Sequence, residues 1–245
     1  MKHISGSVFG YMWSIELGGY CRRPNRHLPK QSTDKPHESV AFSVIRRVEM
    51  CLFLEAAAAW IALLPTEYIL KLGYRKKSYD IRLVFEKANF YHLSGMHYAS
   101  DVDFKISPNK MYGEKLIDAI ISNKINVCDI EKSKKWEKIK DRLEGIVALK
   151  NIVESEFSIY KFSPNKLSFK SEISAEYLIH NPKLNLSIFL FLGDTGDYFY
   201  CKSIFLEKTR DYTQNQTPYT VLQKIKVENG SSKEIFRHPS YRDKQ

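Results

Sequence analysis

The clearest hydrophobic pattern in the chain lies between residues 186 and 226, where polar turns separate three apolar segments. The first segment, residues 186–192, carries no charge and is typical of a strand buried on both faces. The other two, residues 197–206 and 219–226, alternate apolar and polar side chains, as strands with one solvated face do. We expect these three segments to form the centre of an antiparallel sheet.

The rest of the chain is helical in its earlier part and strand-rich in its later part. Pro65 ends the first helix because proline cannot donate the backbone hydrogen bond that a helix needs, and Gly95 ends the second. A basic turn, residues 73–78, joins the first two strands into a hairpin. Helices are expected at residues 48–64, 89–95, 111–121 and 133–153, and further strands at residues 68–72, 79–85, 157–162, 167–173, 176–180 and 234–237. This order predicts an α+β fold in which helices pack on one face of an antiparallel sheet.

Glycine and proline positions set the expected boundaries of the domain. They punctuate residues 1–47, where no helical or strand period persists, so we expect a flexible or irregular N-terminal extension. Residues 48–238 are expected to form the α+β domain, and residues 239–245 a polar tail.

The charge of the chain favours a polyanionic partner. The net charge is +10 and the pI is about 9.3, and residues 71–150 hold 17 Lys and Arg against 11 Asp and Glu. The lysines of the helix at residues 133–153 fit two roles, either a solvated face or a surface that follows a phosphate backbone.

Four cysteines lie far apart, which excludes a zinc knuckle and a CxxC redox site and favours a reduced, intracellular environment; they are Cys21, Cys51, Cys128 and Cys201. No apolar run is long enough to span a membrane, and the N-terminus lacks the pattern of a signal peptide. We therefore expect a soluble, cytoplasmic protein without a membrane partner. The sequence also lacks a compact cluster of metal ligands and any nucleotide-binding fingerprint, so we expect neither a metal nor another cofactor.

Two histidines and two tyrosines occur within eight residues, at Tyr91, His92, His97 and Tyr98. His92 falls in the first turn of a short helix that follows a strand. Histidine transfers protons near neutral pH, which makes His92 a candidate general acid or base. The alternative is structural, with His92 hydrogen-bonded in the core and His97 exposed.

Residues 90–96, with the sequence FYHLSGM, resemble part of the phage-encoded branch of the barnase, EndoU, colicin and RelE-like nucleases. The resemblance extends over about residues 50–236. Its other positions are residues 188–192, Lys202-Ser203-Ile204-Phe205, Tyr212, Gln216, Thr220-Val221-Leu222 and Lys224. The resemblance implies a small helical segment on a four- or five-stranded antiparallel sheet. It also implies metal-independent cleavage of RNA through a 2',3'-cyclic phosphate.

The resemblance also suggests roles for individual residues. His92 would act as acid or base, Lys224 and Lys202 would stabilise the charged transition state, and Ser203 and Thr220 would donate hydrogen bonds to phosphate oxygens. The predicted catalytic residues are His92, Ser203, Thr220 and Lys224, and the predicted substrate-binding residues are Lys202, Tyr212, Gln216 and His97.

Lys202 and Ser203 pose a geometric problem because neighbouring strand residues face opposite sides. Both can line one cleft only if a β-bulge intervenes. Without a bulge, we expect Ser203 to join Thr220 and Lys224.

The sequence thus favours an endoribonuclease, acting as a phage or prophage factor or as a toxin. Its expected partners are RNA, with tRNA among the candidates, and a protein inhibitor. The alternatives are a non-catalytic nucleic-acid-binding module and an interaction protein of a mobile element. The nuclease hypothesis predicts that His92, Ser203, Thr220 and Lys224 converge in one cleft. Scattered side chains beside a continuous basic surface at residues 132–150 would favour the binding module.

Overall fold

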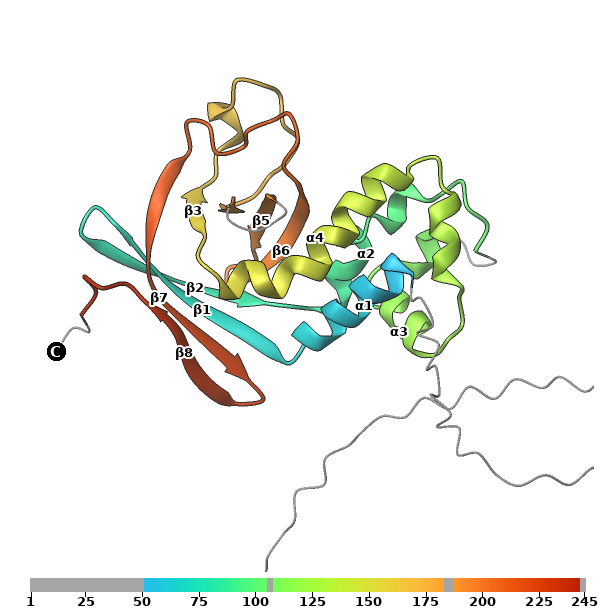
Figure 1. Cartoon of the computed structure of the whole chain (residues 1–245), viewed down its shortest axis with the longest axis horizontal. Coiled ribbons are helices and arrows are strands. Elements are labelled where there is room, and N and C mark those ends of the chain that lie inside the picture. The colour runs from blue at the N-terminus through green and yellow to red at the C-terminus, as the bar shows by residue number, and fades with distance from the viewer. Residues whose placement is uncertain (1–50, 105–107, 183–186, 243–245) are drawn as a thin grey trace, which may run out of the picture. The chain divides into compact units, whose positions relative to one another are not determined.

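The computed structural model describes residues 51–104, 108–182 and 187–242 (Figure 1). The extension predicted for residues 1–47 and the end of the predicted tail, residues 243–245, lie outside the described residues. The helices are α1 (Leu52–Leu63), α2 (Phe90–Leu93), α3 (Lys115–Ile121) and α4 (Trp136–Glu154). The strands are β1 (Thr66–Tyr74), β2 (Lys77–Val84), β3 (Ser158–Lys161), β4 (Tyr177–Asn181), β5 (Ile188–Asp194), β6 (Phe199–Leu206), β7 (Thr217–Glu228) and β8 (Ser231–Arg237). Short 3-10 turns connect several of these elements.

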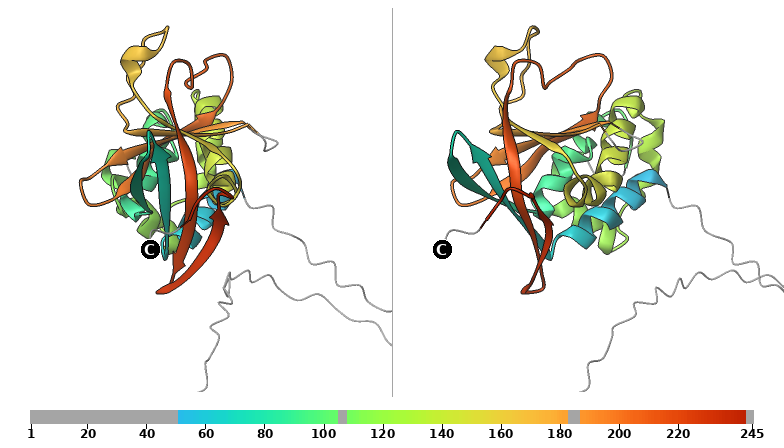
Figure 2. Two further views of the ribbon diagram at one scale, coloured as in Figure 1. Left: turned by 90° about the vertical axis from the view of Figure 1, so that its left-hand side faces the viewer. Right: turned by 60° about the vertical axis from the view of Figure 1, so that its left-hand side comes forward.

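Seven of the strands close into a mixed β-barrel. Their order is β1-β2-β6-β5-β4-β3-β7, and β7 pairs with β1 to complete the circle, while β8 pairs with β7 as one extra strand (Figure 2). The pairing of β2 with β6 is parallel, and the other neighbouring pairs are antiparallel. The predicted antiparallel sheet with helices on one face is therefore wrong.

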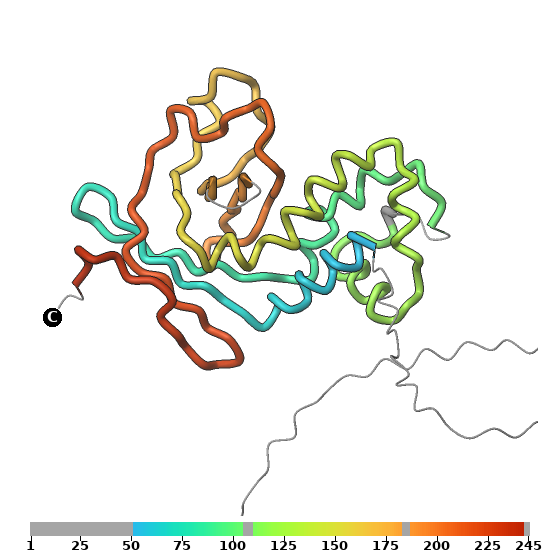
Figure 3. The backbone as a smooth tube through the Cα atoms, viewed as in Figure 1, coloured from blue at the N-terminus to red at the C-terminus, as the bar shows by residue number. Residues whose placement is uncertain are grey.

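The error arises from pairings between distant parts of the chain. β5 and β6 are neighbours, as predicted, but β7 lies between β1 and β3. The tube trace shows β1 and β7 side by side although they come from opposite ends of the domain (Figure 3). Side-chain alternation identifies strands, but it carries no information about which distant strands will meet.

Residues 167–173 were also predicted as a strand, and the structure shows a loop there. Its apolar side chains pack against a second, smaller core cluster on the outer face of β5. The loop contributes Leu167, Phe169 and Ile173, and the buried cluster consists of Phe162, Leu178, Phe189, Phe191 and Tyr212. The alternation of apolar and polar side chains in residues 167–173 therefore belongs to a loop that covers β5, and not to a strand.

The helices α1, α2 and α3 gather to one side of the barrel, and α4 runs from them toward β3 (Figure 1). α4 passes very close to β6 at Gly145, in the middle of the helix. A methyl group at this position would lie 2.9 Å from Cγ1 of Ile204, which is closer than carbon atoms normally approach. The missing side chain of Gly145 therefore allows α4 to lie directly on β6.

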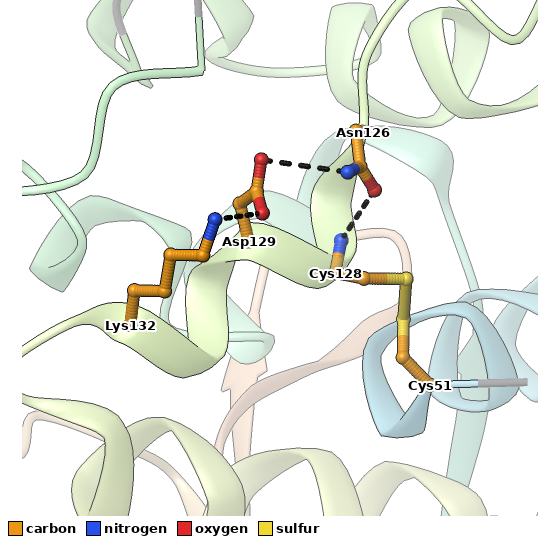
Figure 4. The surroundings of a disulfide bond; sticks show 5 residues. All are labelled: Cys51, Asn126, Cys128, Asp129 and Lys132. Carbon is orange, nitrogen blue, oxygen red and sulfur yellow. Dashed lines mark hydrogen bonds and ion pairs between the residues drawn. A yellow bond between two sulfur atoms is a disulfide. The ribbon is translucent and has the colours of Figure 1, made fainter.

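A disulfide bond between Cys51 and Cys128 joins the start of α1 to the turn η4 (Val127–Lys132) (Figure 4). Asn126 accepts a hydrogen bond from the backbone N–H of Cys128 at 3.3 Å, which fixes the start of this turn. The predicted reduced state is therefore wrong for this pair. Its partners are 77 residues apart, and spacing alone does not reveal such a connection. Cys201 is buried and free.

Within the described ranges, no helix has the length and apolar character needed to cross a membrane.

Candidate active site

A cleft of about 640 Å³ opens between α2, α4 and β6, and it contains four of the predicted site residues. They are His92, His97, Lys202 and Ser203. The volume lies within the usual range for small-molecule sites. The other lining residues are Glu86, Ala88, Asn89, Tyr112, Gly113, Arg142, Thr195, Tyr200 and Cys201.

The short helix α2 holds His92 at this cleft. Its other three residues, Phe90, Tyr91 and Leu93, are buried, whereas His92 is exposed. Gly95 then takes a left-handed conformation with φ 75°, which confirms the predicted end of this helix. His92 thus projects from a single helical turn whose other side chains are fixed in the core.

The two histidines form a pair in the cleft, with ring centroids 5.3 Å apart. His97 is partly buried, and its Nδ1 has no hydrogen-bond partner among the described residues. Burial lowers the pKa of His97 to about 4, with smaller contributions from the charges of Arg142 and His92. His97 is therefore neutral at neutral pH, and its unpaired Nδ1 is buried.

A β-bulge in β6 explains how Lys202 and Ser203 both line the cleft. Ser203 pairs with Phe191 on β5, but the next pair joins Cys201 to Leu192, so Lys202 is an extra residue in the ladder. The core side chains of β6 shift accordingly, since Cys201 and Ile204, three residues apart, are both buried. The bulge removes the geometric objection to a site that contains both residues.

Arg142 adds a second cation to the cleft beside Lys202. It reaches the cleft from α4 and passes close to Gly95. A methyl group added at Gly95 would lie 3.1 Å from Cδ of Arg142. Glu86 stands at the same cleft and accepts a hydrogen bond from the Tyr198 hydroxyl at 2.5 Å. Neither Arg142 nor Glu86 could be predicted as a site residue, because only the fold brings α4 and the segment after β2 to the same cleft.

Lys224 lies away from this cleft and holds the C-terminal end of α4. The residue is only 2% exposed, and its ammonium group donates hydrogen bonds to the carbonyl oxygens of Val153, at 3.0 Å, and of Ser155. These carbonyls carry the negative end of the helix dipole, which a cation stabilises. Burial lowers the pKa of Lys224 to about 8, and the nearby Glu156 and Glu154 act in the opposite direction.

The structure also places the other three predicted residues outside the cleft. Thr220 is exposed on β7 and lines two other hollows. Tyr212 is buried in the second core cluster, where its ring packs against Phe191 with centroids 5.3 Å apart. Gln216 is buried and bonds to the backbone of Ser163, accepting from its N–H at 2.7 Å and donating to its carbonyl at 3.2 Å. Of the four predicted catalytic residues, His92 and Ser203 line the cleft, whereas Thr220 and Lys224 line a separate hollow together.

Among the described residues, no group of three or more His, Cys, Asp or Glu side chains is arranged to hold a metal ion.

Comparison with known proteins identifies the family. Neither the curated proteins nor the solved structures yield a match. A family model described as phage-Barnase-EndoU-ColicinE5/D-RelE like nuclease4 matches residues 52–238. This range runs from the first residue of α1 past the end of β8, so it contains both the complete barrel and the cleft. With most of its length matched, the chain belongs to this family of nucleases of the barnase, EndoU, colicin and RelE type.

Proposed function

We propose that the protein is a metal-independent endoribonuclease that cleaves RNA through a 2',3'-cyclic phosphate. The observation that supports this proposal is the gathering of two histidines, two cations and a serine hydroxyl in one cleft of a nuclease-family chain. RNA cleavage of this kind needs a group that takes the proton of the ribose 2'-hydroxyl and a group that protonates the leaving 5'-oxygen. It also needs cations and hydrogen-bond donors around the phosphate.

His92 is the proposed proton-transfer residue, because it is exposed in the cleft and histidine exchanges protons near neutral pH. His97 is the proposed positioning residue for His92, because the two rings lie 5.3 Å apart and the partly buried ring of His97 stays neutral beside it.

Arg142 and Lys202 are the proposed partners of the phosphate as negative charge develops in the transition state. Ser203 is the proposed hydrogen-bond donor to a phosphate oxygen. This assignment departs from the one based on sequence, in which Lys224 and Thr220 had these roles. Lys224 is already bonded to two carbonyl oxygens, and Thr220 lines other hollows.

The test is incubation of the purified protein with total cellular RNA in EDTA, followed by analysis of the product ends. We expect the wild type to leave 2',3'-cyclic phosphates and His92→Ala to reduce the rate about 10²- to 10⁴-fold. His238→Ala is the matched control, since this histidine lies outside the cleft and bonds to Ser240. Cleavage by His92→Ala at the wild-type rate would refute the assignment of His92. RNA binding without cleavage by the wild type would favour the non-catalytic binding module.

The family description names phage, and a phage- or prophage-associated role, including that of a toxin, is part of the proposal. Expression of the wild type and of His92→Ala in bacterial cells tests it. We expect growth arrest with the wild type only, and sequencing of the cleaved RNA ends would show whether tRNA is the target.

A further inference from the structure

A hollow of about 860 Å³ lies at the tip of the β1–β2 hairpin, and it shares no lining residue with the cleft. We call it the hairpin hollow. The turn between β1 and β2, the first half of β7 and the segment after β8 surround it. The hairpin tip and the C-terminal end of the described chain lie on the side of the barrel away from α1, α2 and α3 (Figure 1).

The lining of the hairpin hollow contains five cationic side chains and no acidic one; the cations are Lys71, Arg75, Lys76, Lys77 and Arg242. Lys71 is partly neutralised, because its Nζ lies 3.5 Å from Oδ1 of Asp80 on β2. Within the described ranges, the other four cations form no ion pair. Their uncompensated charge attracts anions to the hollow.

The turn of the hairpin brings three of these cations together. Arg75 and Lys76 both have a left-handed backbone, with φ 46° and 65°, so the chain reverses within two residues and Tyr74 pairs with Lys77. The ring of Tyr74 stacks on that of Tyr219 with centroids 4.8 Å apart, which holds the turn against β7. The backbone positions of three successive cations are therefore fixed at one end of the hollow.

The segment after β8 provides the facing wall. The N–H of His238 donates to the carbonyl oxygen of Leu222 on β7 at 2.8 Å, and the N–H of Tyr241 donates to the carbonyl oxygen of His238 at 2.9 Å. The segment is thereby folded against β7. It adds Arg242 and the hydroxyl group of Ser240 to the lining.

This arrangement favours an anion that carries several charges in a small volume. The hollow has the size of a small-molecule site. A nucleic-acid strand carries one charge per phosphate and distributes its charges along an extended backbone. A polyphosphate chain concentrates its charges, so adjacent cations on one turn can bind it together, arginine through paired hydrogen bonds and lysine as a point charge.

We propose that the hairpin hollow binds a compact polyphosphate, such as the triphosphate group of a nucleotide. Arg75, Lys76 and Lys77 bind the phosphate chain from the turn, and Arg242 binds it from the facing wall. The site goes beyond the proposed function, because cleavage of RNA in the cleft neither needs this ligand nor excludes it.

Isothermal titration calorimetry on the full chain in EDTA measures the binding of inorganic tripolyphosphate, ATP and adenosine. The test variant is Arg75→Asn/Lys76→Gly, which removes two charges and keeps the turn, because asparagine followed by glycine favours this pair of left-handed residues. The control variant is Lys150→Gln/Lys170→Gln, which removes two charges from exposed positions that line neither the hollow nor the cleft. Both variants have the same net charge, so a difference between them reports the position of the charges.

We expect the wild type and the control variant to bind tripolyphosphate and ATP equally well, and neither to bind adenosine. Arg75→Asn/Lys76→Gly should weaken the binding of both phosphate compounds about tenfold, since it removes two charge contacts. This variant should bind single-stranded 2'-O-methyl RNA, which cannot form a 2',3'-cyclic phosphate, as the wild type does.

Three results would overturn the proposal. They are a wild type that does not bind tripolyphosphate, equal losses in the two variants, which would reduce the effect to net charge, and a parallel loss of RNA binding in Arg75→Asn/Lys76→Gly, which would assign the hollow to RNA.

Discussion

At the scale of single residues, the surroundings of a side chain decide its role more than its chemical type does. Lys202 and Lys224 both belong to strands of the barrel and were both candidates for stabilising a phosphate. Lys202 is exposed at a β-bulge beside the cleft, whereas Lys224 is buried and hydrogen-bonded to the end of α4. The same ammonium group is therefore available to a ligand at one position and engaged by the protein at the other.

This difference predicts opposite effects of the same substitution. Lys202→Met should reduce RNA cleavage about 10²-fold and change the free energy of unfolding by no more than about 0.5 kcal/mol. Lys224→Met should lower the free energy of unfolding by about 1–3 kcal/mol, because it leaves buried carbonyl oxygens without a donor. Urea denaturation and cleavage assays on the remaining folded protein separate the two effects. A stable but inactive Lys224→Met variant would contradict our placement of the site.

His97 predicts a specific dependence of stability on pH. Its pKa is about 4 in the folded protein, against an ordinary value of 6.5. Between these values the unfolded chain binds a proton that the folded protein does not, so the contribution of His97 to stability falls as the pH decreases from about 7 to 4. Urea denaturation midpoints at pH 7.5 and pH 5 measure this loss. We expect His97→Asn to show a weaker pH dependence than the wild type, and His238→Asn to retain it.

At this scale the sequence predicted part of the site. The close spacing of His92 and His97, with Gly95 between them, could be recognised because these residues belong to one short segment. The joint presence of Lys202 and Ser203 could not, because it depends on a bulge whose position is fixed by the pairing of β6 with β5. The contribution of Arg142 depends on how α4 is placed against α2, and no local pattern encodes that placement.

At the scale of elements, the contact between α4 and β6 determines the width of the cleft. α4 carries Arg142, β6 carries Lys202 and Ser203, and Gly145 lies where the two elements touch. Most of the helices and strands could be predicted, since α1 ends before Pro65 and β1 and β2 form the expected hairpin. The close approach of α4 to β6 could not be predicted, because a glycine inside a helix does not indicate which element packs against it.

Gly145→Ala tests the importance of this contact. Alanine favours a helix by about 1 kcal/mol over glycine, but here its methyl group would overlap Ile204. We expect a net loss of about 1–3 kcal/mol in the free energy of unfolding and a reduced cleavage rate, because α4 must move away from β6.

The substitution Ile204→Ala provides the control for this prediction. It removes the group that the new methyl would strike, so the double variant should be more stable than the sum of the two single changes predicts. Additive effects, or a gain of stability in Gly145→Ala alone, would show that the overlap does not matter.

At the scale of the whole molecule, two long-range connections hold the described residues together. One is the closure of the barrel between β1 and β7, and the other is the disulfide between Cys51 and Cys128. Neither could be predicted, since strand alternation does not identify distant partners and widely spaced cysteines do not indicate a pair.

The disulfide predicts a large effect of its removal. A crosslink over 77 residues restricts the unfolded chain, so Cys51→Ser/Cys128→Ser should lower the free energy of unfolding by about 2–4 kcal/mol. Treatment of the wild type with dithiothreitol should cause a similar loss, whereas the same treatment should not affect the double variant. Unchanged denaturation of the reduced wild type would show that the crosslink does not contribute.

The order of the strands around the barrel also determines when the cleft can exist during synthesis. His92 leaves the ribosome early, but Lys202 and Ser203 follow only with β6, and the circle closes only when β7 is available to pair with β1. Since chains emerge from the N-terminus, the unfinished protein has no complete cleft while it is attached to a particle built largely of RNA. The topology therefore delays assembly of the site until β7 has been translated.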